Sequence, residues 1–402
     1  MAKTFQDLDT KLIHTGEPMI AGAVSIPIFQ SSTFESEGGK SYDAIRYIRL
    51  NNTPNHIALH EKLASLENAQ AALVTASGMA AISAALFTVL KGGGHLLVQD
   101  VLYGGTHGLL TSQFAGFGLS YDFIDPSAPQ SWEAKLRPNT RAIYVEAISN
   151  PLMGVPEMEA VVDFAKKHDL VSMIDNTFAT PVNFRPPEWG FDLSLHSATK
   201  YLNGHSDIVA GVVIGRSELV ARINVGLRYY GGTLDPHACF LLHRGLKTLG
   251  VRVRQQNENA LALARFLEGH PGVARVNFPG LESSPDHERA KRYFGGFGGM
   301  LSFEPSGGEK AAKEFMDRVT IPIVAPSLGG VESLLSRPAY TSHLALTPEE
   351  RAGLGIGEGL IRVSVGIESA EELIADFRQA LEWSSGGQTD SKTRADSGRQ
   401  ER

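Results

Sequence analysis

Short apolar stretches alternate with amphipathic segments over residues 70–215. The apolar stretches predict strands at 72–75, 96–99, 120–124, 142–146, 171–174, 193–196 and 208–214. Helical spacing of apolar positions predicts helices between them, at 79–90, 103–115, 158–168 and 217–225. Strands that alternate with helices indicate an α/β fold with a large, mostly parallel sheet covered on both faces. In such sheets the functional residues gather in loops at the carboxyl ends of the strands.

The pattern differs on either side of this region. Residues 1–60 are rich in proline and small polar residues, with helical spacing only from residue 56 to 68, and we expect them to lie on a neighbouring subunit. A long helix is predicted over 236–270. Short strands (274–278, 300–304, 321–325, 360–365) and helices (310–318, 370–383) then indicate a smaller C-terminal α+β domain. The predicted organisation is an arm (1–60), an α/β domain (61–250), the α+β domain (251–384) and a disordered tail (385–402).

Charge and cysteine content narrow the possible partners. The 402 residues carry a formal net charge of −7, which disfavours nucleic acid or an anionic membrane as a partner. The single cysteine, Cys239, excludes an intramolecular disulfide framework and a cysteine-rich metal site, and we expect no metal. One cysteine also fits the reducing cytoplasm, and residues 1–17 lack the apolar core of a signal peptide.

One uncharged stretch, residues 71–90, is long enough to cross a membrane. Ser77 and Gly78 interrupt it, and small residues dominate it. It therefore predicts a buried strand, a turn and a buried helix.

The strand predicted at 193–196 leads directly into Ser197-Ala198-Thr199-Lys200. This turn offers two hydroxyls and an amine within four residues. Pyridoxal phosphate needs both, because its aldehyde takes a lysine and its phosphate takes hydroxyl donors. An isolated turn of this kind is more often an ordinary exposed loop, so the interpretation depends on the other motifs.

Further candidates follow other strands. Gly78 and Met79 begin a helix whose free amides suit a phosphate. Asp175 ends a strand, where a carboxylate can hold a pyridinium nitrogen protonated, and Thr177 stands two residues later, within reach of the ring oxygen. Each feature alone also fits an ordinary turn or strand end.

The remaining candidates are an aromatic residue, an amide and two arginines. Tyr103 can stack on a flat heteroaromatic ring and transfer protons. Asn150, before a proline, can donate to a ring oxygen. Arg49, close to Tyr47 in the arm, can hold a phosphate from a partner chain. Arg362 lies within an apolar strand, where an unpaired charge is costly, so a substrate carboxylate or a buried ion pair is expected to face it.

In combination, these motifs resemble the Cys/Met-metabolism pyridoxal-phosphate enzymes, which include cystathionine γ-synthase, cystathionine γ-lyase, cystathionine β-lyase, methionine γ-lyase and the homoserine-ester sulfhydrylases. The resemblance spans about residues 12–383. It rests on Ser77-Gly78-Met79-Ala80-Ala81, Tyr103-Gly104-Gly105-Thr106, Ser149-Asn150-Pro151, Asp175-Asn176-Thr177-Phe178, Ser197-Ala198-Thr199-Lys200, Arg244-Gly245-Leu246-Lys247-Thr248-Leu249, Ser327-Leu328-Gly329-Gly330-Val331-Glu332-Ser333 and Ile361-Arg362-Val363-Ser364-Val365-Gly366.

The resemblance implies fold type I of the pyridoxal-phosphate enzymes, with homotetramers built as dimers of dimers that share active sites. It implies γ-elimination or γ-replacement on a homoserine-derived or sulfur amino acid, as in transsulfuration. The implied catalytic residues are Lys200, Tyr103 and Asp175. The implied cofactor contacts are Gly78, Met79, Tyr103, Asn150, Asp175, Thr177, Ser197, Thr199 and Lys200, with Tyr47 and Arg49 from the neighbouring subunit. The implied substrate contacts are Ser333, Arg362 and Glu332.

Departures from the family pattern leave the substrate open. The usual Tyr-Ser-Arg-x-x-Asn-Pro-Thr carries an apparent one-residue insertion at Asn51-Asn52-Thr53-Pro54. Gly105 stands where many methionine γ-lyases carry cysteine, and Glu332 matches the γ-lyase and γ-synthase pattern better than that of the β-lyases. The alternatives are methionine γ-lyase, O-acyl-homoserine sulfhydrylase, a γ-lyase for a non-sulfur amino acid and, less favoured, a β-lyase.

Three other classes of protein share parts of this pattern. Ser197 and Lys200 also match the Ser-x-x-Lys of penicillin-recognising acyl transferases, but the accompanying Ser-Asp-Asn and Lys-Thr-Gly motifs are missing. A regulatory protein without activity is disfavoured because every acid, base and phosphate position is filled. An aminotransferase of the same broad fold is distinguished by amino transfer to pyruvate without release of a γ-fragment.

Overall fold

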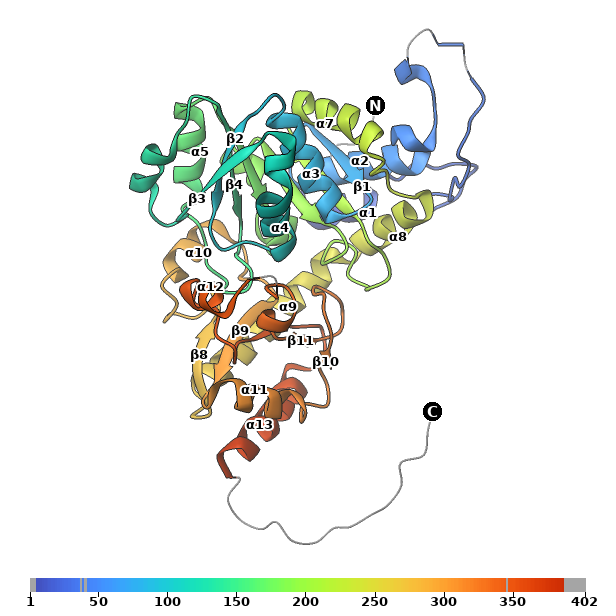
Figure 1. The fold of residues 1–402 in the computed structure, drawn as a ribbon. Coiled ribbons are helices and arrows are strands. Elements are labelled where there is room, and N and C mark those ends of the chain that lie inside the picture. Colours follow the sequence, from blue (N-terminus) through green and yellow to red (C-terminus); the bar gives the residue numbers. More distant parts are fainter. Residues whose placement is uncertain (1–4, 37, 40–41, 345, 387–402) are drawn as a thin grey trace, which may run out of the picture.

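The computed structural model describes residues 5–36, 38–39, 42–344 and 346–386. They form two lobes, each built around one β-sheet, and α9 (Leu249–Glu268) runs from the larger lobe into the smaller one (Figure 1). Of the tail expected over 385–402, residues 385 and 386 instead end the helix Ala370–Gly386, and residues 387–402 lie outside the described residues.

The larger sheet has seven strands in the order β1-β7-β6-β5-β4-β2-β3. The five strands from β2 to β6 are parallel, and β7 pairs antiparallel with both β1 and β6. The predicted α/β fold with a mostly parallel seven-stranded sheet is thus confirmed. Its strands are β1 (Ala71–Thr75), β2 (His95–Gln99), β3 (Ser120–Ile124), β4 (Thr140–Glu146), β5 (Val171–Asp175), β6 (Leu193–Ser197) and β7 (Gly211–Gly215).

Helices cover both faces of this sheet because successive strand side chains point to opposite sides. Leu195 packs with one set of helices and Ile174 with the other, and almost no strand residue is exposed. The first face is covered by α3 (Gly78–Val89), α4 (Gly104–Gln113) and α7 (Ser217–Tyr230). The second face is covered by α2 (Pro54–Leu66), α5 (Met158–Lys167) and α8 (Pro236–Leu246).

The uncharged stretch 71–90 forms β1 and α3, as predicted. Ser77 caps α3, because its Oγ accepts a hydrogen bond from the backbone N–H of Ala80 at 3.0 Å. Among the described residues, no helix is both long and apolar enough to cross a bilayer.

The smaller sheet has the order β10-β11-β12-β9-β8. Its core is formed by buried apolar side chains such as Phe303, Phe315 and Phe377. The strands are β8 (Val273–Asn277), β9 (Met300–Pro305), β10 (Ile323–Val324), β11 (Leu334–Ser336) and β12 (Ile361–Ser364). The helices are α10 (His287–Tyr293), α11 (Gly308–Met316), α12 (Pro348–Gly353) and α13 (Ala370–Gly386).

The helix predicted over 236–270 is wrong as a single element, since it breaks between α8 and α9. The backbone of Gly245 packs so closely on the chain at Asn203 that an added Cβ would lie 2.3 Å from the Asn203 carbonyl oxygen. The buried Arg252 guanidinium then donates to the Gly245 carbonyl at 2.9 Å. The same carbonyl also accepts the backbone N–H of Thr248 at 3.2 Å, so a tight turn and a buried side-chain donor meet where α8 ends.

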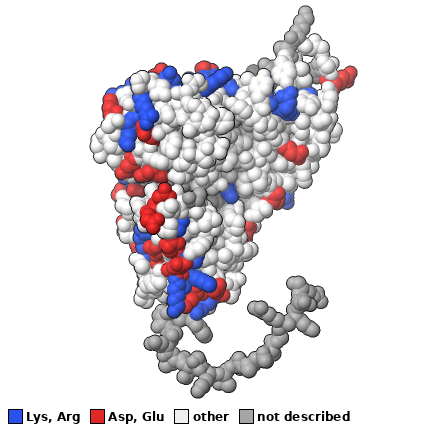
Figure 2. Space-filling view, in the orientation of Figure 1, with Lys and Arg blue, Asp and Glu red and all other residues white. Residues whose placement is uncertain are grey.

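The described part of residues 5–60 is mainly irregular, as expected, but includes the unpredicted α1 (Leu8–His14). Short elements complete the fold: α6 (Thr180–Asn183) and the 3₁₀ turns Tyr42–Ala44, Ile48–Leu50, Phe114–Phe117, Pro129–Lys135, Pro186–Trp189 and Pro338–Tyr340. On the face shown in Figure 2, basic and acidic side chains lie close together instead of forming a continuous basic patch.

Candidate active site

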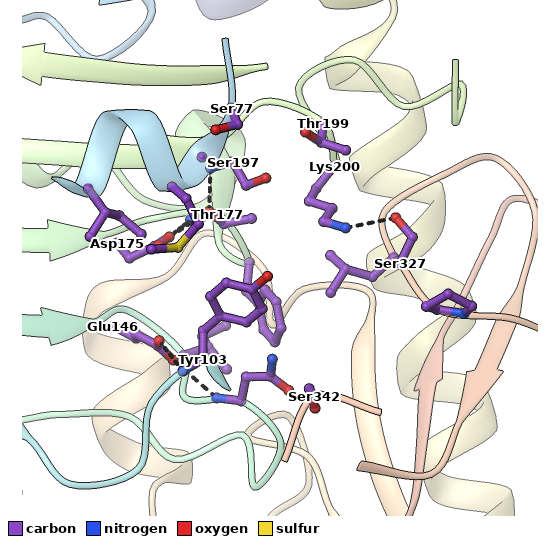
Figure 3. A pocket seen from close by; sticks show the side chains of 18 of the residues that line it. Ser77, Tyr103, Glu146, Asp175, Thr177, Ser197, Thr199, Lys200, Ser327 and Ser342 are labelled. Carbon is purple, nitrogen blue, oxygen red and sulfur yellow. Dashed lines mark hydrogen bonds between the residues drawn. The ribbon is translucent and has the colours of Figure 1, made fainter. Parts of the chain in front are cut away.

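A cavity of about 510 Å³ lies at the carboxyl ends of β4, β5 and β6, where the smaller lobe meets the larger one. Its wall from the larger lobe includes Glu146, Asp175 and Ser197, which end these three strands. Ten of the residues predicted from sequence line it: Gly78, Met79, Tyr103, Asn150, Asp175, Thr177, Ser197, Thr199, Lys200 and Arg362. Figure 3 shows the side chains of several of them facing one another across the cavity.

One end of the cavity is built to accept an anion. The amino-terminal end of α3 opens into it at Ser77 and Gly78, and hydroxyls of Ser197 and Thr199 stand nearby. A Cβ on Gly78 would lie 2.8 Å from the Cβ of Ser197, so the close approach of β6 and α3 requires glycine. Free helix amides and hydroxyls together suit a phosphate.

Asp175 presents a half-buried carboxylate to the same cavity. Its Oδ1 accepts hydrogen bonds from the Thr177 backbone N–H at 2.9 Å and the Thr177 hydroxyl at 2.5 Å. The Thr177 hydroxyl in turn accepts the backbone N–H of Ser197 at 2.8 Å, which ties the ends of β5 and β6 together. Burial raises the pKa of Asp175, against the effect of these hydrogen bonds. A protonated pyridine nitrogen beside Asp175 would offset the free-energy cost of burying the ionised carboxylate.

Lys200 reaches across the cavity from the turn after β6. Its Nζ donates to the Oγ of Ser327 at 2.8 Å (Figure 3). Burial, and secondarily the charge of Arg362, lowers the pKa of Lys200 to about 8. A lysine with a depressed pKa is a suitable nucleophile toward an aldehyde. Ser327 was not predicted as a site residue, although it begins the Ser-Leu-Gly-Gly motif.

Arg362 projects from β12 and is 5% exposed. Among the described residues, its hydrogen-bond acceptors are neutral oxygens: the side-chain Oδ1 of Asn150 and the backbone carbonyl of Ser327, both at 3.2 Å. Burial lowers its pKa to about 10. A buried guanidinium with neutral partners is suited to bind a carboxylate that enters the cavity.

Tyr103 precedes α4, and its ring projects into the cavity (Figure 3). The residue is 42% exposed, so the ring is open to a molecule that enters. Its backbone N–H donates to Oε1 of Glu146 at 2.7 Å. Glu146 lines the cavity too, although the sequence pattern indicated it only as the end of the strand predicted at 142–146.

Four predicted residues do not line the cavity. Tyr47 and Arg49 belong to the irregular arm, and the Arg49 guanidinium is exposed, donating to the Tyr42 hydroxyl at 2.9 Å. Ser333 is buried and donates to Glu368 at 2.9 Å, while Glu332 accepts a hydrogen bond from the Ser206 hydroxyl.

In the part of the chain that the structure describes, no cluster of three or more His, Cys, Asp or Glu side chains is arranged to hold a metal ion.

Known proteins match this chain over almost its whole length. It is 42% identical over 385 residues to an L-methionine gamma-lyase from Porphyromonas gingivalis, covering 93% of this chain and 96% of that protein. It is 41% identical to the cystathionine beta-lyase MetC of Bacillus subtilis, covering 95% and 98%. The crystal structure of cystathionine gamma synthase from Xanthomonas oryzae pv. oryzae, in complex with aminoacrylate and cysteine, matches with a TM-score of 0.91 and 39% identity, covering 95% and 99%.

The family described as Cys/Met metabolism PLP-dependent enzyme matches residues 9–382. This range contains both sheets and every residue that lines the cavity. The chain therefore belongs to the Cys/Met metabolism family of pyridoxal-phosphate-dependent enzymes.

Proposed function

We propose that this protein catalyses γ-elimination or γ-replacement on a homoserine-derived or sulfur amino acid. The observation that carries the proposal is the meeting, in one cavity, of a lysine of lowered pKa, a half-buried carboxylate and a buried arginine: Lys200, Asp175 and Arg362. Relatives named for γ-acting and β-acting enzymes have similar identity to this chain. The choice of γ over β chemistry therefore rests also on Glu332, which fits the γ-acting pattern.

The residues present fit pyridoxal phosphate. The α3 amino terminus, with Gly78, Ser197 and Thr199, would hold the phosphate. Asp175 would hold the ring nitrogen, and Lys200 would hold the aldehyde carbon covalently. When bound, the cofactor supplies an electron sink for negative charge that develops at the substrate Cα.

The protein's own groups then position the substrate and move protons. Arg362 binds the substrate α-carboxylate, because its described acceptors leave its charge uncompensated. Lys200 would remove the proton from Cα, and a second proton must leave Cβ before the γ-substituent can depart. Tyr103, whose ring enters the cavity from the α4 side, assists departure of the γ-substituent. Such acid–base groups typically contribute about 10²–10⁴-fold each.

The reaction class is tested with a panel of homoserine esters, cystathionine, methionine and oxygen-linked analogues. Ammonia, oxo acid and thioether are measured as products. We expect release of the γ-substituent from at least one substrate and no turnover by Lys200→Ala. Release of only β-substituents, or near-normal turnover by the variant, would refute the proposal.

We further propose a homotetramer in which two subunits share each site. The hydroxyls and amides at the phosphate end are neutral, and a doubly charged phosphate calls for a cation there. The exposed guanidinium of Arg49, with Tyr47 beside it, would supply this charge from a second subunit. We also propose that the enzyme acts in the cytoplasm.

Shared sites are tested by subunit complementation. Arg49→Ala and Lys200→Ala are each expected to be inactive, but a mixture refolded together should regain about a quarter of the activity, because half of the dimers are mixed and each has one intact site. No recovery in mixed dimers would contradict the sharing of sites, and a monomeric active enzyme would contradict the assembly.

A further inference from the structure

A buried carboxylate beside Asp175 has no role in the function proposed above. Glu146 ends β4 directly opposite Asp175 in the strand register, so both side chains point to the same face of the sheet. Glu146 is 4% exposed and lines the cavity. Two neighbouring carboxylates repel each other when both are ionised, so other interactions of Glu146 must offset this electrostatic cost.

The two oxygens of Glu146 hold two separate segments of the cavity wall. Oε1 accepts the backbone N–H of Tyr103 at 2.7 Å, and Oε2 accepts the backbone N–H of Asn150 at 3.2 Å. Tyr103 lies at the start of α4, after β2, whereas Asn150 lies in the loop after β4. Figure 3 shows Glu146 close to Tyr103, with dashed lines near its oxygens.

Each of these segments carries a group that works in the cavity. Tyr103 supplies the ring that enters it, and the Asn150 side chain accepts a hydrogen bond from the Arg362 guanidinium at 3.2 Å. The backbone N–H of Glu146 is itself fixed, since it donates to the Gln99 side-chain oxygen at 2.7 Å. The Glu146 carboxylate, at a rigid strand end, thus sets the position of the Tyr103 ring relative to Arg362.

The arrangement needs a carboxylate in particular. An ionised carboxylate accepts at both oxygens, whereas an amide accepts at one and places an NH₂ donor at the other. Glutamine at this position would therefore set a donor against the N–H of either Tyr103 or Asn150. Burial, and secondarily the charge of Asp175, raises the pKa of Glu146 to about 8. The two backbone N–H donors lower the pKa against burial, and Glu146 is ionised, with both oxygens acting purely as acceptors, above about pH 8.

We propose that Glu146 is a positioning residue that fixes Tyr103 and Asn150 relative to each other, and thereby the cofactor ring relative to the substrate-binding Arg362. This inference rests on the proposed function, because it assigns the cofactor and the substrate carboxylate to this cavity. It assigns Glu146 no contact with the reacting atoms.

The test compares Glu146→Gln with Asp376→Asn in the cofactor-loaded protein. Asp376 is a matched control: it is 6% exposed and accepts the backbone N–H groups of Thr320 and Ile321, but it lies on α13 away from the cavity. Visible circular dichroism of the bound cofactor reports the ring's surroundings, and kcat and KM report the reaction. E146Q should lose visible dichroism and about 10–100-fold in kcat/KM, while D376N should lower only the unfolding temperature.

A double-mutant cycle with Tyr103→Ala separates positioning from a general loss of structure. If Glu146 acts through Tyr103, E146Q should cost less in the Tyr103→Ala background than alone. If E146Q is insoluble, Glu146→Asp, which keeps both acceptors on a shorter arm, takes its place, with a smaller loss expected.

Unchanged dichroism and kcat/KM in the Glu146 variant, equal effects in D376N, or full additivity with Tyr103→Ala would each overturn the proposal. Failure of the proposed function is distinguishable, since the unmodified protein would then show no cofactor band or no γ-chemistry.

Discussion

The amine of Lys200 should lose its proton far more readily than that of an ordinary lysine. Burial lowers its pKa from 10.5 to about 8, with the charge of Arg362 as the second cause. Such a shift makes the neutral amine at pH 7 about 300-fold more abundant. Because only the neutral amine attacks an aldehyde, the apoprotein should take up pyridoxal phosphate readily near neutral pH.

Substitution of Arg362 separates the two causes of the lowered Lys200 pKa, which are burial and the neighbouring positive charge. Arg362→Met removes the positive charge but keeps an apolar side chain in the buried position, so the pKa of Lys200 should rise. It should still stay below 10.5, because burial is the larger of the two causes. The variant should therefore need a higher pH than the unmodified apoprotein for the same rate of cofactor uptake.

The assay is a brief acetylation of the apoprotein over a broad pH range, with peptides quantified by mass spectrometry. Lys310, whose side chain is 87% exposed, is the internal control. The labelling rate of Lys200 should level off above about pH 8, and at a higher pH in Arg362→Met. A Lys200 profile that coincides with that of Lys310, or that moves to lower pH in the variant, would refute the reasoning.

Further predictions concern the anion end, a strained residue and the smaller core. Gly78→Ala should weaken retention of the cofactor after desalting, because the added Cβ would lie 2.8 Å from the Cβ of Ser197. Gly108→Ala is the control, since its added Cβ would have no neighbour within 4 Å, and this variant should retain the cofactor. Equal retention by the two variants would contradict the prediction. Ser327→Gly should melt at a higher temperature than Ser327→Ala, since Ser327 has φ of 93° and such strain costs about 1–3 kcal/mol; the reverse order would contradict it. Phe377→Ala should lower the free energy of unfolding in urea by about 3–5 kcal/mol, since the ring is wholly buried; a loss below about 1 kcal/mol would contradict this.

The larger sheet could be predicted because each of its strands is a short apolar run between helices. The break between α8 and α9 could not, because the amphipathic pattern continues through Lys247 and Thr248. At the break Gly245 packs against the backbone of Asn203, and its carbonyl accepts a hydrogen bond from Arg252. Sequence spacing does not reveal either contact.

The same limit applies to the site. Lys200 and Asp175 stand at or just after strand ends, so sequence alone placed them at one edge of the sheet. Ser327 lies in a loop of the smaller lobe, and its contact with Lys200 spans 127 positions of the chain. Ser333 belongs to the same motif as the cavity-lining Ser327 and was predicted as a substrate contact, but its hydroxyl donates to Glu368 in this structure. Membership of a motif therefore did not reveal which of its side chains face the cavity.

The proposed function depends on Lys200 carrying pyridoxal phosphate in the cavity between the two lobes. The most direct measurement is borohydride reduction of the loaded protein, followed by digestion and mass mapping of the labelled peptide. We predict a reduced pyridoxyl phosphate group on Lys200 and on no other residue. A label on a different lysine, or a protein that binds no cofactor on reconstitution, would contradict this assignment.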